Sequence, residues 1–344
     1  MRVDAPFALA NLGAAGAEAQ RLEALGYDGA FTFDGPHDPF FPLVQAAAAT
    51  ERIELFTAVA IAFARSPMLL AQIGHDLQTL SQGRFRLGLG SQIRAHIERR
   101  FSQPWSQPAA RMREFVSALR AIWACWNDGV PLAFRGAFYT HTLMPPLLRP
   151  APCPFGPPPV WLAGVGPRMT EVAGEVADGF LLHPFHTPEF LAGVTRPALD
   201  RGLASAGRAR RDFTVGAQVL IASGRDAAEF ESARTAVRAQ IAFYGSTPAY
   251  RGVLDSVGRG ALHPELHALS RSGDWRAMAA RVDDEVLESI AVCAPPDALG
   301  ERLLQRYGGF ADRLSLVAPW QPAVLNIRVP LKYMSPPEPA LATP

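Results

Sequence analysis

Short apolar runs alternate regularly with segments of helical periodicity along this 344-residue chain, and this alternation limits the folds that it can adopt. Short apolar runs are typical of buried strands, and the longer periodic segments are typical of amphipathic helices. Eight strands are predicted, at residues 3–9, 29–33, 53–61, 84–89, 160–163, 179–182, 213–221 and 313–317. Eight strand–helix units in succession predict an α/β fold, a closed parallel (β/α)8 TIM barrel rather than an open sheet.

Two segments interrupt this alternation. Residues 132–142 are predicted to form a β-hairpin that turns at Arg135-Gly136, and the next stretch, residues 145–159, holds eight prolines and is expected to be extended. Residues 245–290 carry only mixed short helical patterns. We predict one barrel domain, residues 1–325, with insertions at about 130–159 and 245–290 and a C-terminal tail, 326–344. A domain boundary at the prolines is less favoured, because the same alternation resumes after them.

Composition argues against several function classes. A net charge of +1 gives no electrostatic reason to expect nucleic acid or anionic lipid as a partner. Only one of the 33 basic residues is a lysine, Lys332, whereas Schiff-base, pyridoxal phosphate and P-loop enzymes need a lysine within the site. The three cysteines, Cys125, Cys153 and Cys293, lack metal-binding or redox spacing and are expected to be reduced thiols.

No segment is typical of secretion or of a membrane span. The N-terminal residues Asp4 and Pro6 interrupt the apolar run that a signal peptide needs. The longest uncharged apolar stretch, Leu55–Ala64, is about half the length of a membrane-spanning helix. We therefore expect a cytoplasmic protein that acts on a small molecule.

The loop after the second predicted strand carries Asp34, His37 and Asp38. Chemistry in such barrels takes place on loops at the carboxyl ends of the strands. Two carboxylates and an imidazole could act as general acid and base or bind a metal, and a turn that only shapes the backbone is the alternative. A metal would need further ligands, such as His183 and His186, so no metal site is predicted.

A glycine-rich turn, Gly164-Val165-Gly166, follows the fifth predicted strand and leads into a helix that begins at Pro167. Glycines allow a ligand close to the backbone, and the N–H groups at a helix N-terminus favour phosphate. A dinucleotide-binding fingerprint is not expected, because Met169 stands where its third glycine belongs.

The loop after the fourth predicted strand begins with Ser91 and Gln92 and is rich in cationic and imidazole side chains. They are Arg94, His96, Arg99 and Arg100. The four together would suit an anionic ligand, or Arg99 and Arg100 could be solvated charges on a helix.

Several motifs together resemble one known family. The segments LEALGYDGAFTFD, FTAVAIAFARSP, LSQGRFRLGLGSQ, PPVWLAGVGP and VADGF occur in this order. In this combination the chain resembles the bacterial luciferase-like monooxygenase superfamily over roughly residues 1–320, and is most similar to its deazaflavin-dependent branch, which uses coenzyme F420. The resemblance implies a luciferase-like TIM barrel, an oxidoreductase activity with F420 and a homodimer. The alternatives are an FMN-dependent monooxygenase, a metal-dependent barrel hydrolase and a non-catalytic cofactor-binding protein.

The resemblance also implies roles for individual residues. It places a non-prolyl cis peptide at Ala58-Val59, after Thr57, behind the cofactor ring. Asp34 and His37 are expected near the reacting ring, with His37 as proton donor and Asp34 as its orienting partner or a substrate contact. The implied cofactor-binding residues are Thr57, Ala58, Val59, Ser91, Gln92, Gly164, Val165 and Gly166.

One position departs from the pattern of the relatives that oxidise sugar phosphates. Ile93 stands where those relatives carry a glutamate proton donor, so sugar-phosphate oxidation is not expected. The insertion at residues 245–290 is expected to form a lid.

Overall fold

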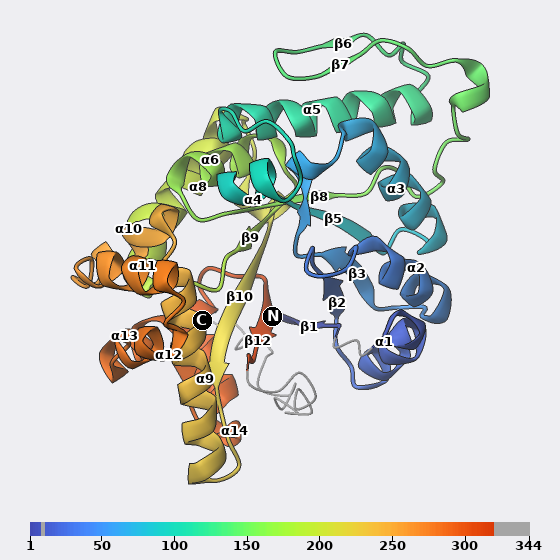
Figure 1. The fold of residues 1–344 in the computed structure, drawn as a ribbon. Helices are drawn as coiled ribbons and strands as arrows, with labels where there is room; N and C mark the ends of the chain where they lie inside the picture. The colour runs from blue at the N-terminus through green and yellow to red at the C-terminus, as the bar shows by residue number, and fades with distance from the viewer. Residues whose placement is uncertain (8–10, 320–344) are drawn as a thin grey trace, which may run out of the picture. The chain divides into compact units, whose positions relative to one another are not determined.

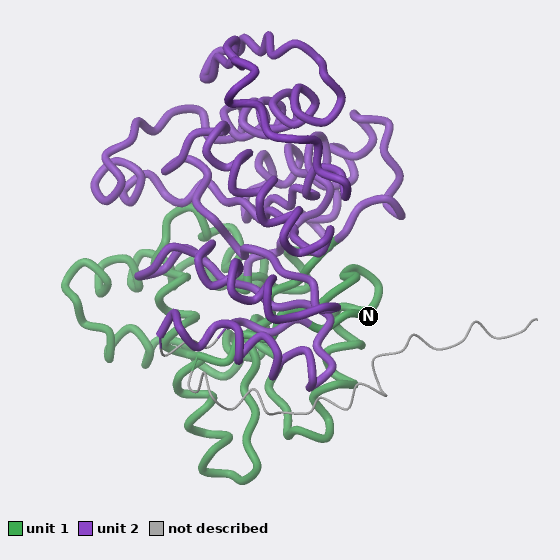
Figure 2. The backbone as a smooth tube through the Cα atoms, turned by 90° about the vertical axis from the view of Figure 1, so that its right-hand side faces the viewer, with its two compact units in different colours: residues 1–3, 184–191, 215–344 green, residues 4–183, 192–214 purple. Residues whose placement is uncertain are grey.

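The computed structural model describes residues 1–7 and 11–319 (Figure 1). The chain divides into two compact units, which are coloured separately in Figure 2. Unit 2 comprises residues 4–183 and 192–214, and unit 1 comprises residues 1–3, 184–191 and 215 onward. The predicted tail, 326–344, and residues 8–9 of the first predicted strand lie outside the described residues.

Parallel strands form the sheet of unit 2. Residue pairing joins β1, β2, β3, β5, β8 and β9 in this order, with Asp4 opposite Gly29 and Leu87 opposite Val160. The strands are β1 Arg2–Pro6, β2 Gly29–Thr32, β3 Glu54–Thr57, β5 Phe85–Gly90, β8 Val160–Gly164 and β9 Gly179–Leu182. The intervening helices are α1 Ala15–Ala24, α2 Phe40–Ala49, α3 Pro67–Leu80, α5 Pro108–Asn127, α6 Pro167–Val176 and α8 Arg196–Ser205. Helices α1, α2 and α3 lie on one side of β2 and β3 (Figure 1).

Local sequence explains where these helices begin and end. Helix α3 begins after Ser66, whose hydroxyl accepts a hydrogen bond from the Leu69 N–H at 3.2 Å, and has Pro67 in its first turn. The chain leaves α1 through Gly26, at a φ of 84° that favours glycine. The predicted helix at 188–206 is instead divided into α7 Pro188–Phe190, a π-helical turn Leu191–Thr195, and α8.

The third predicted strand, residues 53–61, is interrupted. Strand β3 ends at Thr57, and a short strand β4, Ala60–Ile61, resumes the pairing with β5. The two residues between them, Ala58 and Val59, are joined by a non-prolyl cis peptide, which confirms the prediction for this bond.

Strands β3 and β5 approach each other closely at Gly88. The Thr57 hydroxyl donates to the Gly88 carbonyl oxygen at 2.6 Å and accepts from the Gly88 N–H at 3.0 Å. A Cβ atom on Gly88 would lie 1.7 Å from the Thr57 carbonyl oxygen, so only glycine fits at this position.

Replacing Gly88 with alanine is expected to lower the free energy of unfolding by about 3 kcal/mol or more, because backbone must move and both Thr57 bonds are strained. Chemical denaturation measures this change. The matched control is Gly193→Ala, where a Cβ would meet nothing within 4 Å. Equal stability of the two variants would contradict the close approach.

Unit 1 has a shorter set of parallel strands. Strand β10, Thr214–Ala222, pairs with β12, Arg313–Val317, and with a two-residue strand β11, Val292–Cys293, that the sequence did not predict. Helix α9, Ala227–Gly245, packs against three of the four helices within residues 245–290, and the last helix, α14 Pro296–Tyr307, follows β11. Those four helices are α10 Arg251–Asp255, α11 Leu262–Ser272, α12 Trp275–Ala280 and α13 Asp284–Ile290.

A hairpin forms where it was predicted and is anchored to α5, but Arg135 belongs to a strand and the turn spans residues 136–139. Strands β6, Phe134–Arg135, and β7, Thr140–His141, pair in antiparallel fashion. The Glu114 carboxylate on α5 accepts the N–H groups of residues 137, 138 and 139 at 2.6–2.8 Å. After a 3-10 turn, Pro146–Leu148, the proline-rich stretch contains neither helix nor strand.

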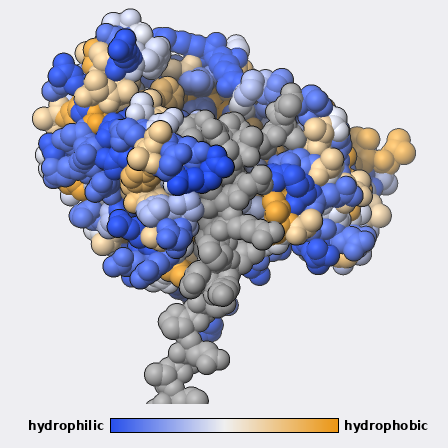
Figure 3. Space-filling model, turned by 90° about the horizontal axis from the view of Figure 1, so that it is seen from below, coloured by the Kyte–Doolittle hydropathy of each residue, from blue (hydrophilic) through white to orange (hydrophobic). Residues whose placement is uncertain are grey.

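Every helix that the structure describes is too short or too polar to cross a bilayer. The face drawn in Figure 3 is mostly hydrophilic, with apolar residues scattered over it.

Candidate functional site

The predicted site residues all belong to unit 2 and follow four neighbouring strands. Asp34 and His37 come after β2, and residues 91–92 follow β5. Residues 57–59 begin at the last residue of β3, and residues 164–166 begin at the last residue of β8. Because β2, β3, β5 and β8 are parallel and pair in this order, their carboxyl ends lie along one edge of the sheet. The structure therefore brings the predicted residues to one side of the sheet.

A cluster of buried side chains lies below this edge. Phe31, Phe56, Trp161 and Leu181 are each at most 3% exposed. The Phe56 ring lies 5.4 Å from that of Phe31 and 5.2 Å from that of Trp161, between centroids. Three partly exposed residues pack against the cluster, and we call them the apolar shelf: Ala58, Val59 and Ala163.

Glycine is needed where β5 passes the shelf, because a Cβ atom on Gly90 would lie 2.6 Å from a methyl group of Val59. Thr57, by contrast, is fully buried, and its hydroxyl is used by Gly88. Thr57 therefore joins two strands, and because the whole residue is buried it is not exposed for the predicted cofactor contact.

The glycine turn after β8 has two different glycines. A Cβ atom on Gly164 would lie 2.9 Å from Met169 Cγ, so Gly164 is needed for packing against α6. A Cβ atom on Gly166 would meet nothing within 4 Å, and its φ of −77° is open to any residue. Gly166 caps the ten-residue helix α6, which has Pro167 at its start and no acidic residue in its first turn. This turn is therefore an open, electropositive position that suits a phosphate.

Asp34 is tied to Arg65, a residue for which the sequence predicted no role. Its Oδ2 accepts from Arg65 Nη1 at 2.5 Å and from the Ile61 N–H at 2.6 Å, and its Oδ1 accepts from Arg65 Nη2 at 3.1 Å. These bonds correct the expectation that Asp34 orients His37 directly, because no hydrogen bond joins the two. The Asp34 side chain is only 7% exposed.

Arg65 also binds Asp38, through Nη2 at 3.0 Å, and its guanidinium lies 5.4 Å from the Phe40 ring centroid. Burial disfavours the charge on Arg65, but the hydrogen bonds to Asp34 and Asp38 outweigh it, so the pKa of the guanidinium is raised above its ordinary value. Arg65 lies in the FARSP segment, directly before the residue that caps α3. Its place in that segment was the sequence feature by which a role for Arg65 could have been noticed.

His37 differs from its two acidic neighbours. It is exposed, and no hydrogen bond or ion pair joins its ring to any described residue. Of the titratable groups in this loop, only the His37 imidazole is unpaired within the described ranges.

The loop after β5 is partly a helix, α4 Arg94–Arg99, rather than the long loop expected. Arg94 pairs with Glu98 at 2.9 Å, and His96 is exposed. Arg99 is also exposed, as expected for a solvated helix charge. Arg100 instead donates to the Gly35 carbonyl oxygen at 2.6 Å and joins this loop to the β2 loop.

Ser91 and Gln92 form the turn before α4. The Ser91 hydroxyl donates to the Gln92 carbonyl oxygen at 3.0 Å, and Gln92 has a φ of 60°. The Gln92 side-chain oxygen accepts from the Ile93 N–H, also at 3.0 Å. Both side chains are partly exposed at the edge of the site.

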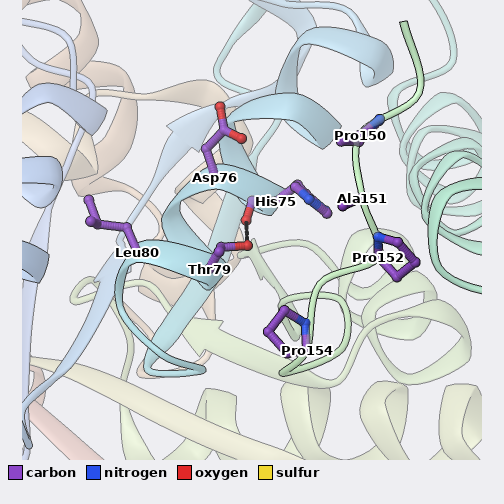
Figure 4. A pocket seen from close by; sticks show the side chains of 8 residues that line it. All are labelled: His75, Asp76, Thr79, Leu80, Pro150, Ala151, Pro152 and Pro154. Carbon is purple, nitrogen blue, oxygen red and sulfur yellow. Dashed lines mark hydrogen bonds between the residues drawn. The ribbon is translucent and has the colours of Figure 1, made fainter. Parts of the chain in front are cut away.

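Other features of the described chain do not point to a second centre. No group of three His, Cys, Asp or Glu residues within the described ranges could hold a metal ion. His186, considered as a ligand, has its Nε2 2.9 Å from the Tyr307 hydroxyl. A shallow pocket between α3 and the proline-rich stretch, lined by His75, Thr79 and four residues of 150–154, shares no residue with the site (Figure 4).

The chain matches the model of a known protein family, and its fold matches that of solved structures. The family model for the luciferase-like monooxygenase matches residues 3–313, so the chain belongs to that family. A solved structure, the coenzyme F420-dependent tetrahydromethanopterin reductase of Methanopyrus kandleri, superimposes with a TM-score of 0.75 at 18% identity, covering 91% of this chain and 92% of that one. The predicted luciferase-like (β/α)8 TIM barrel is thereby confirmed.

The similar proteins include one uncharacterized protein and two that are named as enzymes. An uncharacterized protein of Mycobacterium tuberculosis is 55% identical over 86% of this chain and 87% of its own length. An F420-dependent glucose-6-phosphate dehydrogenase of Intrasporangium calvum is 31% identical over 60% of this chain and 64% of its length. The EDTA monooxygenase of Chelativorans sp. BNC1 has the same fold, with a TM-score of 0.68 at 17% identity, covering 97% of this chain and 93% of that one. Proteins similar to this chain in sequence or in fold thus include F420-dependent enzymes and a monooxygenase.

Proposed function

We propose that this chain is an F420-dependent oxidoreductase that acts on a small organic substrate. The observation that carries the proposal is the pairing of the apolar shelf with the open position at Gly166, on the carboxyl ends of β3 and β8. The shelf suits the flat ring of the cofactor, and the turn at Gly166 suits its phosphate. The relatives named as F420-dependent support the choice of cofactor.

Each group of residues has a task in this proposal. Ala58, Val59 and Ala163 support the ring, Gly164–Gly166 and the N-terminus of α6 hold the phosphate, and Ser91 and Gln92 border the ring. When bound, the cofactor supplies or accepts a hydride. His37 supplies or removes the proton at the substrate, because its side chain is exposed and imidazole groups are suited to proton transfer near neutrality.

The second candidate is an FMN-dependent monooxygenase that uses oxygen. The similarity to the EDTA monooxygenase favours it, since the same shelf could hold an FMN ring. Sugar phosphates are not the substrates we propose, because Ile93 gives the β5 loop no proton-donating side chain at that position.

Titration of the purified chain with F420 and with FMN is expected to give saturable binding of F420 at least tenfold tighter than that of FMN. The two cofactors offer the shelf a similar ring, so affinity and the fluorescence change on binding decide between them. Tighter binding of FMN would favour the monooxygenase. Binding of neither cofactor would contradict the proposed function.

We also propose that the chain is a cytoplasmic homodimer. Two exposed apolar residues of α2, Phe41 and Val44, lie one turn apart and would be covered by a second copy. Light scattering on the sample used for the titration gives the molecular mass, and a monomer mass would contradict the dimer.

A further inference from the structure

Arg65 joins segments that follow two different strands. Its two terminal nitrogens bind both carboxylate oxygens of Asp34 after β2, and Nη1 also lies 3.3 Å from the carbonyl oxygen of Ile61 on β4. Asp34 in turn accepts the Ile61 N–H, and its own N–H donates to the Val59 carbonyl oxygen at 3.0 Å. The β2 loop and the shelf are therefore held by one set of bonds.

The same guanidinium fixes both ends of the segment that carries His37. Asp34 and Asp38 lie on either side of His37 in the chain, and both bind Arg65. Asp38 also accepts the Phe40 N–H at 2.8 Å, which connects the loop to the first turn of α2. Both carboxylates are therefore engaged by Arg65, and the imidazole between them is not.

We propose that Arg65 is a positioning residue: it fixes His37 at the edge of the site and holds Val59 of the shelf in place. The proposal rests on the proposed function, in which the shelf supports the cofactor ring. A bidentate guanidinium–carboxylate pair suits this task because it fixes orientation as well as distance. Lysine has a single charged nitrogen and could replace only part of it.

The first part of the test needs no cofactor. Hydrogen–deuterium exchange, read by mass spectrometry, should rise at least tenfold in residues 34–40 and 58–65 of Arg65→Met, and remain unchanged in residues 108–127 of α5. Arg65→Lys should recover part of the protection. Arg94→Met is the matched control, because Arg94 is an exposed arginine paired with Glu98, and should leave both segments unchanged. Unchanged exchange in Arg65→Met would overturn the proposal.

The second part separates the ring from the phosphate. The probes are F420 and the ribityl deazaflavin that remains without its phosphate side chain, each titrated by fluorescence. Arg65→Met should weaken both at least tenfold, and Arg65→Lys should weaken both less. If exchange rises in both segments of Arg65→Met but the variant binds both probes with wild-type affinity, the proposal that Arg65 holds the shelf in place is overturned. If the wild-type chain binds neither probe, the proposed function fails, and the exchange result alone decides whether Arg65 holds the loop.

A milder variant covers the case in which Arg65→Met does not fold. Asp38→Asn weakens only one of the Arg65 bonds, at a side chain that is 35% exposed. It should raise exchange in residues 34–40 by a smaller factor and leave residues 58–65 protected. An equal rise of exchange in both segments, or no rise in either, would contradict the proposal that the Asp38 bond to Arg65 holds residues 34–40 alone.

Discussion

Replacing Gly166 with valine is expected to weaken F420 binding by tenfold or more, about 1.4 kcal/mol, while the free energy of unfolding stays nearly unchanged. A Cβ on Gly166 meets no protein atom within 4 Å, and its φ suits any residue, so the folded chain tolerates the substitution. The valine side chain would instead occupy the space in which a phosphate approaches the N–H groups of α6. Fluorescence titration and chemical denaturation measure the two effects separately.

The controls for Gly166→Val use the same side chain and a different ligand. Gly193→Val adds the same atoms at another open glycine and should bind F420 as the wild type does. The ribityl deazaflavin without phosphate should bind Gly166→Val and the wild type with similar affinity. Unchanged affinity of Gly166→Val for F420 would remove the phosphate from this turn.

Replacing His37 with alanine is expected to lower kcat by about 10²–10⁴ with any substrate that the wild-type chain turns over, while cofactor affinity stays nearly the same. The reason is that hydride transfer must be accompanied by movement of a proton, and the other titratable groups of the β2 loop are bound to Arg65. Steady-state kinetics and cofactor titration give the two quantities.

His96→Ala is the matched control, because His96 is another exposed imidazole and lies on α4. It should keep its turnover. If His37→Ala retains full turnover, the proton comes from another group, such as His96 or water, and His37 is only a turn residue. If both variants lose turnover, the two imidazoles act together and the single-donor assignment is wrong.

The barrel could be predicted from sequence because its signals are local. Strand length, helical periodicity and capping residues such as Ser66 and Gly26 act within a few positions along the chain. The glycine turn at residues 164–166 was also visible, since two glycines before a proline-started helix have few other uses. The resemblance to the family supplied the cis peptide at Ala58-Val59, which the structure contains.

The pairings between loops that lie far apart in the sequence are visible only in the tertiary structure. Arg65 and Asp34 are 31 positions apart, as are Thr57 and Gly88, and neither pairing leaves a local pattern. The two glycines of the turn at residues 164–166 look alike in the sequence, yet Met169 crowds only Gly164. Side-chain contacts across parallel strands depend on how the strands pair, so the role of Asp34 as the partner of Arg65 could be read only after the strands were in place.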